Sequence, residues 1–209
     1  MAVSAYVIAA MAGNFAHESN VNPGVWESLV PSTFDHEYQY DGIGGYGLGQ
    51  WTNVGTPYGR LWNMYSWLTA NGYQPSDGNG QLAYIVHENT WYNNTGVYAD
   101  LTAFLNSTST DLYQLTREWL LNWEGIGTDT LDIRYGHAQT FLTYIQEHAQ
   151  DDPASYEWIS GNMYLSTSEM CNNAMCIFFY FRGYVPPSPG EEILIVKKKR
   201  MQRKRFLIL

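Results

Sequence analysis

The chain has 209 residues and a formal net charge of −9 at pH 7. Seven of its eleven basic residues lie between Lys197 and Arg205, which leaves residues 1–196 with four basic residues against all twenty acidic ones, a net charge of −16. A body this acidic has no basic face, so binding of nucleic acid is not expected. No apolar run approaches the ~20 residues of a membrane span, so no spanning helix is expected.

The first predicted element is a buried helix over residues 2–20. No Lys or Arg precedes its apolar run, which favours a helix over a signal peptide. One helix face carries, in order, Val7, Met11, Phe15 and Glu18. A glutamate at the end of such a stripe is expected to lose water around its carboxyl group, which raises its pKa and lets it hold a proton near neutral pH. Asn22-Pro23-Gly24 ends the helix, because proline cannot continue it.

A glycine-rich, aromatic stretch follows. Residues 26–52 are predicted to form a loop and one short antiparallel β-hairpin, with turn signals at Asp41-Gly42 and Gly44-Gly45. Glycine lets the backbone approach a ligand closely, and the faces of Tyr and Trp rings suit stacking on sugars. A carboxylic acid at a helix end beside such a hairpin is typical of a cleft in which glycans are cleaved.

The remaining predicted elements are helices, expected at residues 56–71, 81–93, 101–105, 110–123, 131–149 and 166–181. Thr56 and Asp111 are predicted as caps, and Ser166 with Glu169 fits a capping box. The residues expected to face inward from the helix over 131–149 are Ile133, Ala138, Phe141, Leu142 and Ile145. Cys171 and Cys176 fall on different faces of the last helix, so two free thiols and assembly in a reducing cytosol are expected.

Three motifs near the start of the chain carry a resemblance to a known family. They are Glu18-Ser19, Asn22-Pro23-Gly24-Val25-Trp26-Glu27 and Gly44-Gly45-Tyr46-Gly47-Leu48-Gly49-Gln50-Trp51-Thr52. In this order they resemble the phage tail lysozyme family of the lysozyme-like superfamily, strongly over residues 1–55 and diffusely to about 150. Lytic transglycosylases share the same skeleton. The resemblance implies a mainly α fold of the α+β, lysozyme-like type, a helical domain with one small antiparallel β-hairpin beside the active-site cleft.

The same resemblance implies roles for individual residues. Glu18 is expected to be the catalytic acid. The expected sugar contacts are Tyr46, Gly47, Gln50, Trp51, Glu88 and Tyr92, with a core position under the hairpin as the alternative for Trp51. Candidates for a second carboxylate are Asp35, Glu37 and Asp41, and a lytic transglycosylase would need none of them. Glu124 matches a glutamate of the family and is expected to tie helices together through a buried pair rather than to act in catalysis.

Other chemistries find little support in the sequence. His17-Glu18 and His36-Glu37 belong to no His-Glu-x-x-His pattern, and the two cysteines lack zinc spacing, so neither a metal nor a cofactor is expected. Ser19 has no Gly-x-Ser-x-Gly context, which disfavours a serine hydrolase.

The chain is predicted to consist of three parts. Residues 1–150 are expected to form the lysozyme-like catalytic domain, residues 151–184 a linker and a C-terminal helix docked on it, and residues 185–209 a Pro-rich linker and a flexible basic tail. Residues 165–174 resemble the segment with which this family usually opens, so the helix is expected to pack beside residues 2–15 as a permuted leading helix. The alternatives are a second, truncated unit or a helix that dimerises.

The function implied is hydrolysis of the β-1,4 bond between N-acetylmuramic acid and N-acetylglucosamine in bacterial peptidoglycan. The enzyme would belong to a phage tail or virion and be assembled in the host cytoplasm. The alternatives are a lytic transglycosylase acting on the same bond and a catalytically inactive glycan-binding tail module. The basic tail suits anionic wall polymers or a neighbouring tail protein, and a purely solubilising end is the alternative.

Overall fold

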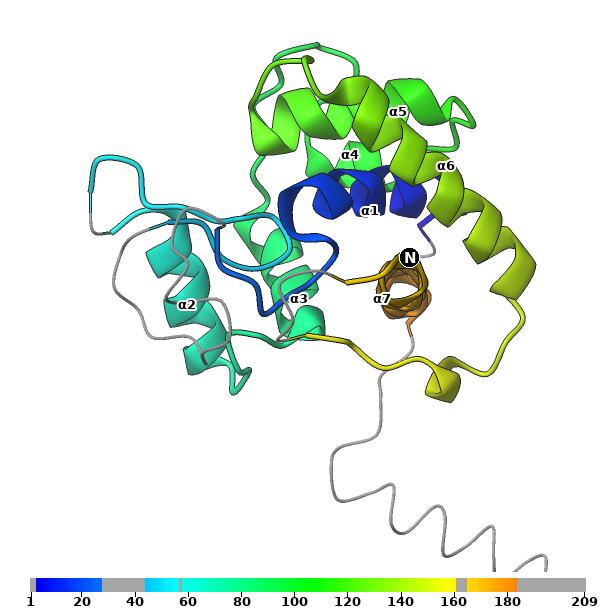
Figure 1. Cartoon of the computed structure of the whole chain (residues 1–209). Coiled ribbons are helices and arrows are strands. Elements are labelled where there is room, and N and C mark those ends of the chain that lie inside the picture. Colours follow the sequence, from blue (N-terminus) through cyan, green and yellow to red (C-terminus); the bar gives the residue numbers. More distant parts are fainter. Residues whose placement is uncertain (1–2, 28–43, 57, 161–164, 184–209) are drawn as a thin grey trace, which may run out of the picture.

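The computed structural model describes residues 3–27, 44–56, 58–160 and 165–183, so the predicted tail over 185–209 lies outside the described residues. Its elements are α1 (Ala5–Ser19), α2 (Arg60–Ala70), α3 (Gly78–Glu88), α4 (Leu101–Leu105), α5 (Leu112–Trp119), the π-helical turn η2 (Leu120–Glu124), α6 (Leu131–His148), the 3-10 turn η3 (Pro153–Ser155) and α7 (Thr167–Phe181) (Figure 1). The predicted mainly α class is confirmed. Within the described ranges, no helix combines the length and the apolarity needed to cross a membrane.

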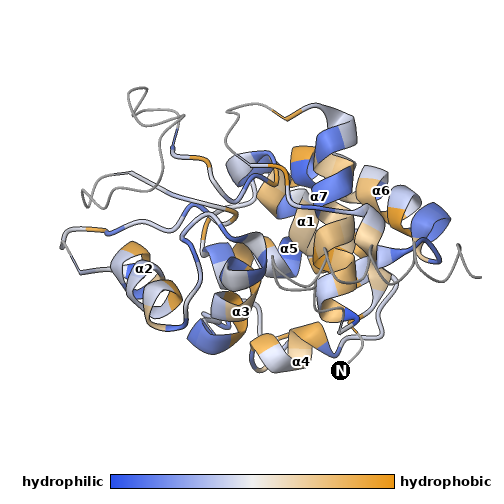
Figure 2. Ribbon diagram, turned by 90° about the horizontal axis from the view of Figure 1, so that it is seen from below, coloured by the Kyte–Doolittle hydropathy of each residue, from blue (hydrophilic) through white to orange (hydrophobic). Residues whose placement is uncertain are grey.

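Helix α1 is the centre of the fold. Ser4 caps it, with the side-chain oxygen accepting a hydrogen bond from the backbone N–H of Val7 at 3.3 Å. Helices α5 and α6 pack on one side of α1 and α7 packs on the other (Figure 1). Hydrophobic residues therefore gather on α1 and α7 in the middle of the molecule (Figure 2). Gly13 marks a close approach to α6, because a Cβ there would lie 2.6 Å from the carbonyl oxygen of Arg134.

The predicted β-hairpin is not confirmed. The described part of this region holds two isolated antiparallel bridges, Trp26 with Tyr46 and Tyr46 with Trp51, and no strand. Between the bridged residues the chain turns at Gly47, whose φ of +75° lies in the left-handed region that glycine adopts without strain. The intervening residues 28–43 lie outside the described part of the chain.

Helix α2 begins later than predicted. Thr56 does not cap it, and the helix starts only at Arg60. The side-chain Oδ1 of Asn53 takes the place of a cap, because it accepts hydrogen bonds from the N–H groups of Gly59 at 2.8 Å and Trp62 at 3.1 Å. An asparagine seven residues ahead of a helix gives no local capping signal, which explains the error.

The bounds of the other helices agree more closely with those predicted from the sequence. The helices predicted at 101–105, 110–123 and 131–149 are present, and the carboxylate of Asp111 caps α5 by accepting from the N–H of Gln114 at 2.9 Å. Helix α3 starts three residues earlier than predicted, because Asp77 caps it, and ends at Glu88. The inward position predicted for Ile133 in α6 is wrong, since its side chain is 56% exposed.

Helix α7 packs on α1 and α6 and buries a face of large apolar side chains. Its capping box is confirmed, since Ser166 accepts from the N–H of Glu169 at 3.3 Å and Glu169 accepts from the N–H of Ser166 at 2.7 Å. The fully buried Asn173 donates from Nδ2 to the carbonyls of Val21 and Ile159, both at 2.8 Å, and accepts from the N–H of Ile159 at 2.8 Å. One amide thus joins α7, the end of α1 and the segment before α7.

Candidate active site

Glu18 lies in the last turn of α1 with its side chain 20% exposed. The guanidinium of Arg134, on α6, donates from Nη2 to Glu18 Oε1. Arg134 is itself buried and fixed, because it also donates to Thr130 Oγ1 at 2.9 Å and to the carbonyl and side-chain oxygens of Asn14, both at 3.3 Å. The protein therefore holds one oxygen of the Glu18 carboxylate in a defined place at the end of α1.

This ion pair corrects the predicted environment of Glu18. The apolar stripe was expected to leave the carboxyl group without polar neighbours, but the guanidinium of Arg134 forms an ion pair with it. The stripe is apolar as far as the fully buried Phe15. The sequence gives no sign that Arg134, 116 residues further along the chain, meets its end.

Ser19 joins the end of α1 to the turn over residues 44–51. Its buried hydroxyl lies 3.0 Å from the carbonyl oxygen of Phe15 and 2.9 Å from that of Leu48. Because Ser19 follows Glu18 directly, the contact fixes the carboxylate relative to the turn. The Glu-Ser pair and the Gly-Leu-x-Gln motif, which the sequence analysis singled out, are thus brought together.

Gln81 is a site-building residue that sequence reasoning missed. It is fully buried at the start of α3, and its Oε1 accepts from the N–H of Leu48 at 2.8 Å. Its Nε2 donates to the carbonyls of Pro23 and Pro75, both at 2.7 Å. The turn lies so close that a Cβ on Gly47 would come 2.6 Å from the Gln81 amide. A glutamine in a helical pattern is normally read as a surface residue, so no local signal reveals this role.

Tyr46 and Trp51 are core residues, which corrects the expected sugar contacts. Each exposes only 1% of its surface. The Tyr46 ring packs on Trp26 at 4.7 Å between centroids, and the Trp51 ring lies perpendicular to Trp123 at 5.6 Å. Rings buried this deeply have no free face for a sugar. The core position that was the alternative for Trp51 is the one observed.

Glu88, another expected sugar contact, has partners within the protein. Arg60 donates from Nε to Glu88 Oε1 at 2.7 Å and from Nη2 to Oε2 at 2.8 Å, a bidentate pair that joins α2 to α3. The indole Nε1 of Trp51 lies 3.5 Å from Oε2. The Arg60 guanidinium also sits over the Trp123 ring, 4.9 Å from its centroid, in a cation–π contact. Both Glu88 oxygens are therefore occupied.

Glu124 ends the π-helical turn η2 and forms no ion pair among the described residues. The expected pairing between helices is not found there, because its hydrogen-bond partner Trp119 belongs to α5, which runs directly into η2. Glu124 Oε1 accepts this hydrogen bond from Trp119 Nε1 at 3.3 Å. Burial, and secondarily the negative charge of Glu18, raise the pKa of Glu124 to about 8, while Arg134 and Arg60 oppose the shift. The carboxyl group of Glu124 therefore keeps its proton at neutral pH.

The remaining predicted site residues differ in how far they are exposed to a ligand. Gln50 turns its amide inward, donating to the carbonyls of Val25 at 3.3 Å and Gly47 at 3.1 Å. Tyr92 is 52% exposed and is free to meet a ligand. The three candidates for a second carboxylate, Asp35, Glu37 and Asp41, lie outside the described residues.

An open hollow of about 530 Å³ lies between α2 and α3. Its lining residues are Asn63, Ser66, Trp67, Tyr84, His87 and Glu88. The rings of Trp67 and His87 stack at 4.9 Å between centroids. Aromatic faces beside amide, hydroxyl and carboxylate groups are the surroundings in which sugars bind. Glu88 belongs both to this hollow and to the ion pair with Arg60.

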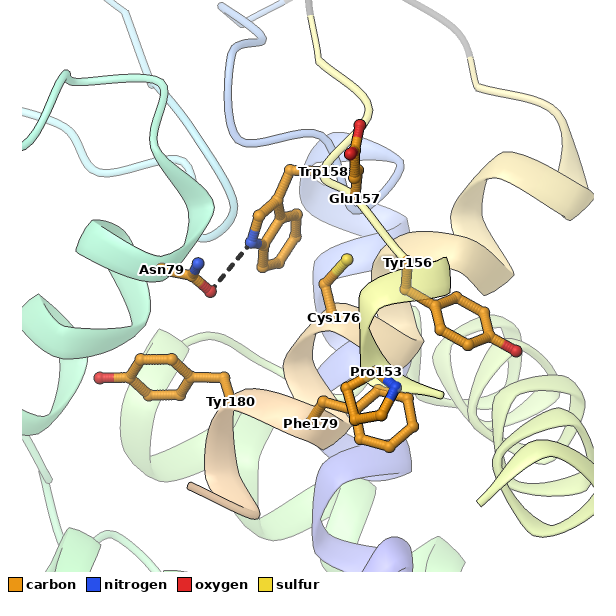
Figure 3. Close-up of a pocket in the computed structure, with 8 residues that line it drawn as sticks. All are labelled: Asn79, Pro153, Tyr156, Glu157, Trp158, Cys176, Phe179 and Tyr180. Atoms are coloured by element: carbon orange, nitrogen blue, oxygen red, sulfur yellow. Dashed lines mark hydrogen bonds between the residues drawn. The ribbon is translucent and has the colours of Figure 1, made fainter. Parts of the chain in front are cut away.

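A second cavity, of about 150 Å³, lies between α3, the segment over residues 153–158 and α7 (Figure 3). Trp158 forms one wall, with Nε1 donating to Asn79 Oδ1 at 3.1 Å, and Cys176 lies at the centre (Figure 3). Burial raises the pKa of the Cys176 thiol to about 12, so it stays protonated at neutral pH and is no nucleophile. Within the described residues no three His, Cys, Asp or Glu side chains are grouped to hold a metal ion.

Comparison with known proteins adds one positive finding. The model of the phage tail lysozyme family matches residues 2–145, which include every group described around Glu18. The match ends within α6, so α7 lies beyond it. No curated protein matches the chain.

Proposed function

The chain belongs to the phage tail lysozyme family, and we propose that it hydrolyses the β-1,4 bond between N-acetylmuramic acid and N-acetylglucosamine. The family is one of peptidoglycan-degrading phage proteins, which makes peptidoglycan the substrate class. The choice of bond, the hydrolytic outcome and the place in the virion tail are parts of the proposal. Assembly in the host cytoplasm is a further part.

The observation that carries the proposal is the placement of Glu18. Its carboxylate is partly exposed at the end of α1, fixed by Arg134 and held beside the 44–51 turn through Ser19. A reacting carboxyl group needs this combination, because it must meet the substrate and yet keep its position.

Cleavage of a glycosidic bond requires a proton on the leaving oxygen while positive charge develops on the sugar ring. Glu18 in its acid form donates that proton, and its carboxylate then stabilises the positive sugar. Arg134 keeps the carboxylate in place between the two steps. The sugar chain is proposed to contact Tyr92 and the hollow between α2 and α3, with Gly47, Gln50 and Glu88 supporting its path.

The test is the activity of Glu18→Gln on purified cell walls. Glutamine keeps the shape and can still accept the hydrogen bond from Arg134 but carries no transferable proton, so clearing of a wall suspension should fall by ~10²–10⁴-fold while the circular dichroism spectrum stays that of the folded chain. Glu147→Gln, an exposed glutamate of α6, is the matched control and should clear walls like the wild type. Near wild-type clearing by Glu18→Gln would refute the assignment.

Product analysis separates this proposal from its alternatives. Hydrolysis leaves reducing N-acetylmuramic acid ends. A lytic transglycosylase would leave anhydromuramic ends instead, because the sugar's own hydroxyl closes the ring. Binding to walls with no release of fragments would identify an inactive glycan-binding module.

A further inference from the structure

The cavity between α3, residues 153–158 and α7 has a buried floor and an open rim (Figure 3). Its floor is formed by Cys176 and Phe179 of α7, which are both buried. Its rim carries Asn79 and Trp158, which are half-buried, and Glu157, which is exposed. Apart from Asn79, every lining residue lies beyond the stretch that the lysozyme family model matches. Most of the cavity is therefore built by a part of the chain that this model does not describe.

The indole of Trp158 is a fixed wall of the cavity. Its Nε1 donates to Asn79 Oδ1 at 3.1 Å. A Cβ on Gly78 would lie 2.3 Å from each of the two carbons that the rings of this indole share, so the backbone of α3 covers one face of it. The rest of the side chain borders the cavity, and these two contacts keep it from collapsing into the empty space.

Tyr156 forms a second aromatic wall. Its hydroxyl donates to Asp151 Oδ2 at 2.6 Å, outside the cavity, and its ring lies 5.6 Å from that of Phe179 between centroids. Tyr156 therefore presents ring surface to the cavity and keeps its hydroxyl occupied elsewhere.

Polar groups at the rim are available to a ligand. Asn79 uses Oδ1 to accept from Trp158, and its Nδ2 has no hydrogen-bond partner among the described residues. The carboxylate of Glu157 takes part in no ion pair with the described residues. The cavity thus offers one free amide donor and one free acceptor beside its aromatic walls.

Size and charge restrict the class of ligand. The cavity measures about 150 Å³, the size of an apolar cavity that takes up one benzene ring, so it has room for one six-membered ring. None of its lining residues is basic and Glu157 is acidic, which disfavours anions such as the phosphates of wall polymers. Aromatic faces with a donor and an acceptor at the edge suit a neutral ring that is apolar on its face and polar at its rim. A sugar has this chemistry.

We propose that this cavity binds one N-acetylglucosamine residue of a glycan strand, as a second sugar site apart from the candidate active site. The choice of this sugar rests on the proposed function. N-acetylglucosamine is neutral and carries no peptide, whereas N-acetylmuramic acid bears a peptide stem for which the cavity has no room. The acetyl methyl group packs on Cys176 and Phe179, Asn79 donates to a sugar oxygen, and Glu157 accepts from a sugar hydroxyl.

The first turn of α3 joins this cavity to the candidate active site. Asn79 and Gln81 both belong to that turn, and Gln81 accepts from the N–H of Leu48 in the turn over residues 44–51. A glycan held in the cavity is therefore attached to an element that also supports the surroundings of Glu18. Binding at a second point raises the local concentration of glycan at the first, so even a weak site keeps the protein on a polymeric wall.

The test is a titration with chitotriose, a trimer of N-acetylglucosamine, in the Glu18→Gln chain so that no cleavage is expected. The reporter is the indole N–H signal of Trp158 in ¹⁵N-labelled protein, identified by its loss in Trp158→Phe. We expect this signal to shift and to saturate as chitotriose is added. No shift up to the solubility limit of the sugar would overturn the inference. A shift with toluene and none with chitotriose would show a cavity for apolar rings and would equally overturn it.

Cys176→Met closes the cavity from its floor. The longer, flexible side chain extends into space that is empty, so the chain should keep its folded circular dichroism spectrum. Chitotriose should then no longer shift the Trp158 signal. Cys171→Ala is the control, because Cys171 is the other buried thiol of α7 and does not line the cavity, and it should respond like the parent chain. A full response in folded Cys176→Met would contradict binding in the cavity.

Glu157→Gln is an exposed change that leaves the buried floor intact. It exchanges a charged acceptor for a neutral one and should weaken chitotriose binding by ~10-fold. Unchanged affinity would contradict the contact with Glu157. The two proposals fail separately. If Trp158 responds to chitotriose while Glu18→Gln still clears walls, the proposed function fails and the sugar site stands. If Glu18→Gln loses clearing and Trp158 does not respond, the sugar site fails and the proposed function stands.

Discussion

Replacing Asn173 with alanine tests how firmly α7 belongs to the body of the protein. The Asn173 side chain is fully buried and makes three hydrogen bonds to backbone groups outside its own helix. Alanine keeps the helix but removes all three bonds. The change therefore probes the docking of α7 without altering α7 itself.

The expected loss follows from the partners left behind. The carbonyl of Val21 is buried and loses its partner completely, while the two groups of Ile159 are only partly covered and can recover water. Leaving one backbone group fully unpaired and two partly unpaired should lower the free energy of unfolding by about 3 kcal/mol. For a chain of this length that lowers the melting temperature by roughly 6–12 °C.

The assay is thermal unfolding followed by circular dichroism, with urea unfolding for the free energy. Gln139→Ala is the matched control, because it removes an exposed amide that donates to the hydroxyl of Tyr135 at 3.1 Å. The control should stay within ~0.5 kcal/mol of the wild type. If Asn173→Ala behaves like the control, the three hydrogen bonds of the amide do not stabilise the docking of α7.

Two predictions concern larger deletions. A chain ending at Asp151 should lose several kcal/mol of stability, because it gives up buried side chains such as Met175, Ile177 and Phe178 at ~1.5–3 kcal/mol each, and an unchanged melting temperature would contradict the docking. A chain cut after Pro189 should cleave short soluble glycans as before but bind whole walls more weakly and with less salt sensitivity, measured by co-sedimentation. Lost activity on the short glycans would show instead that the tail belongs to the fold.

The elements predictable from the sequence are those determined by neighbouring residues. Helix α1 is apolar along its length and capped by the residue before it, and α7 begins with a capping box within four residues. Asp111 likewise caps α5 from the adjacent position. In each case the deciding contacts lie within one helical turn, where residue type and spacing are sufficient.

The site depends on contacts that are distant along the chain. Glu18 could be found because it lies in a motif, but its partner Arg134 and the buried Gln81 are charged or polar residues of helices that would normally face water. The aromatic residues Tyr46 and Trp51 were assigned to sugar because their motif is rich in glycine. Both rings are buried instead, because Tyr46 packs on Trp26 and Trp51 packs on Trp123. These contacts join residues that are distant along the chain, so local sequence does not reveal them.

The body of the protein has few cations that could stabilise an ionised Glu124. Residues 1–196 contain four basic residues, and two of them, Arg60 and Arg134, are already committed to ion pairs at the site. Among the described residues, the cations that favour ionisation of Glu124 are Arg134 and Arg60, and their effect is smaller than that of burial and of the Glu18 charge. The carboxyl group of Glu124 is therefore neutralised by a bound proton and not by a further basic side chain.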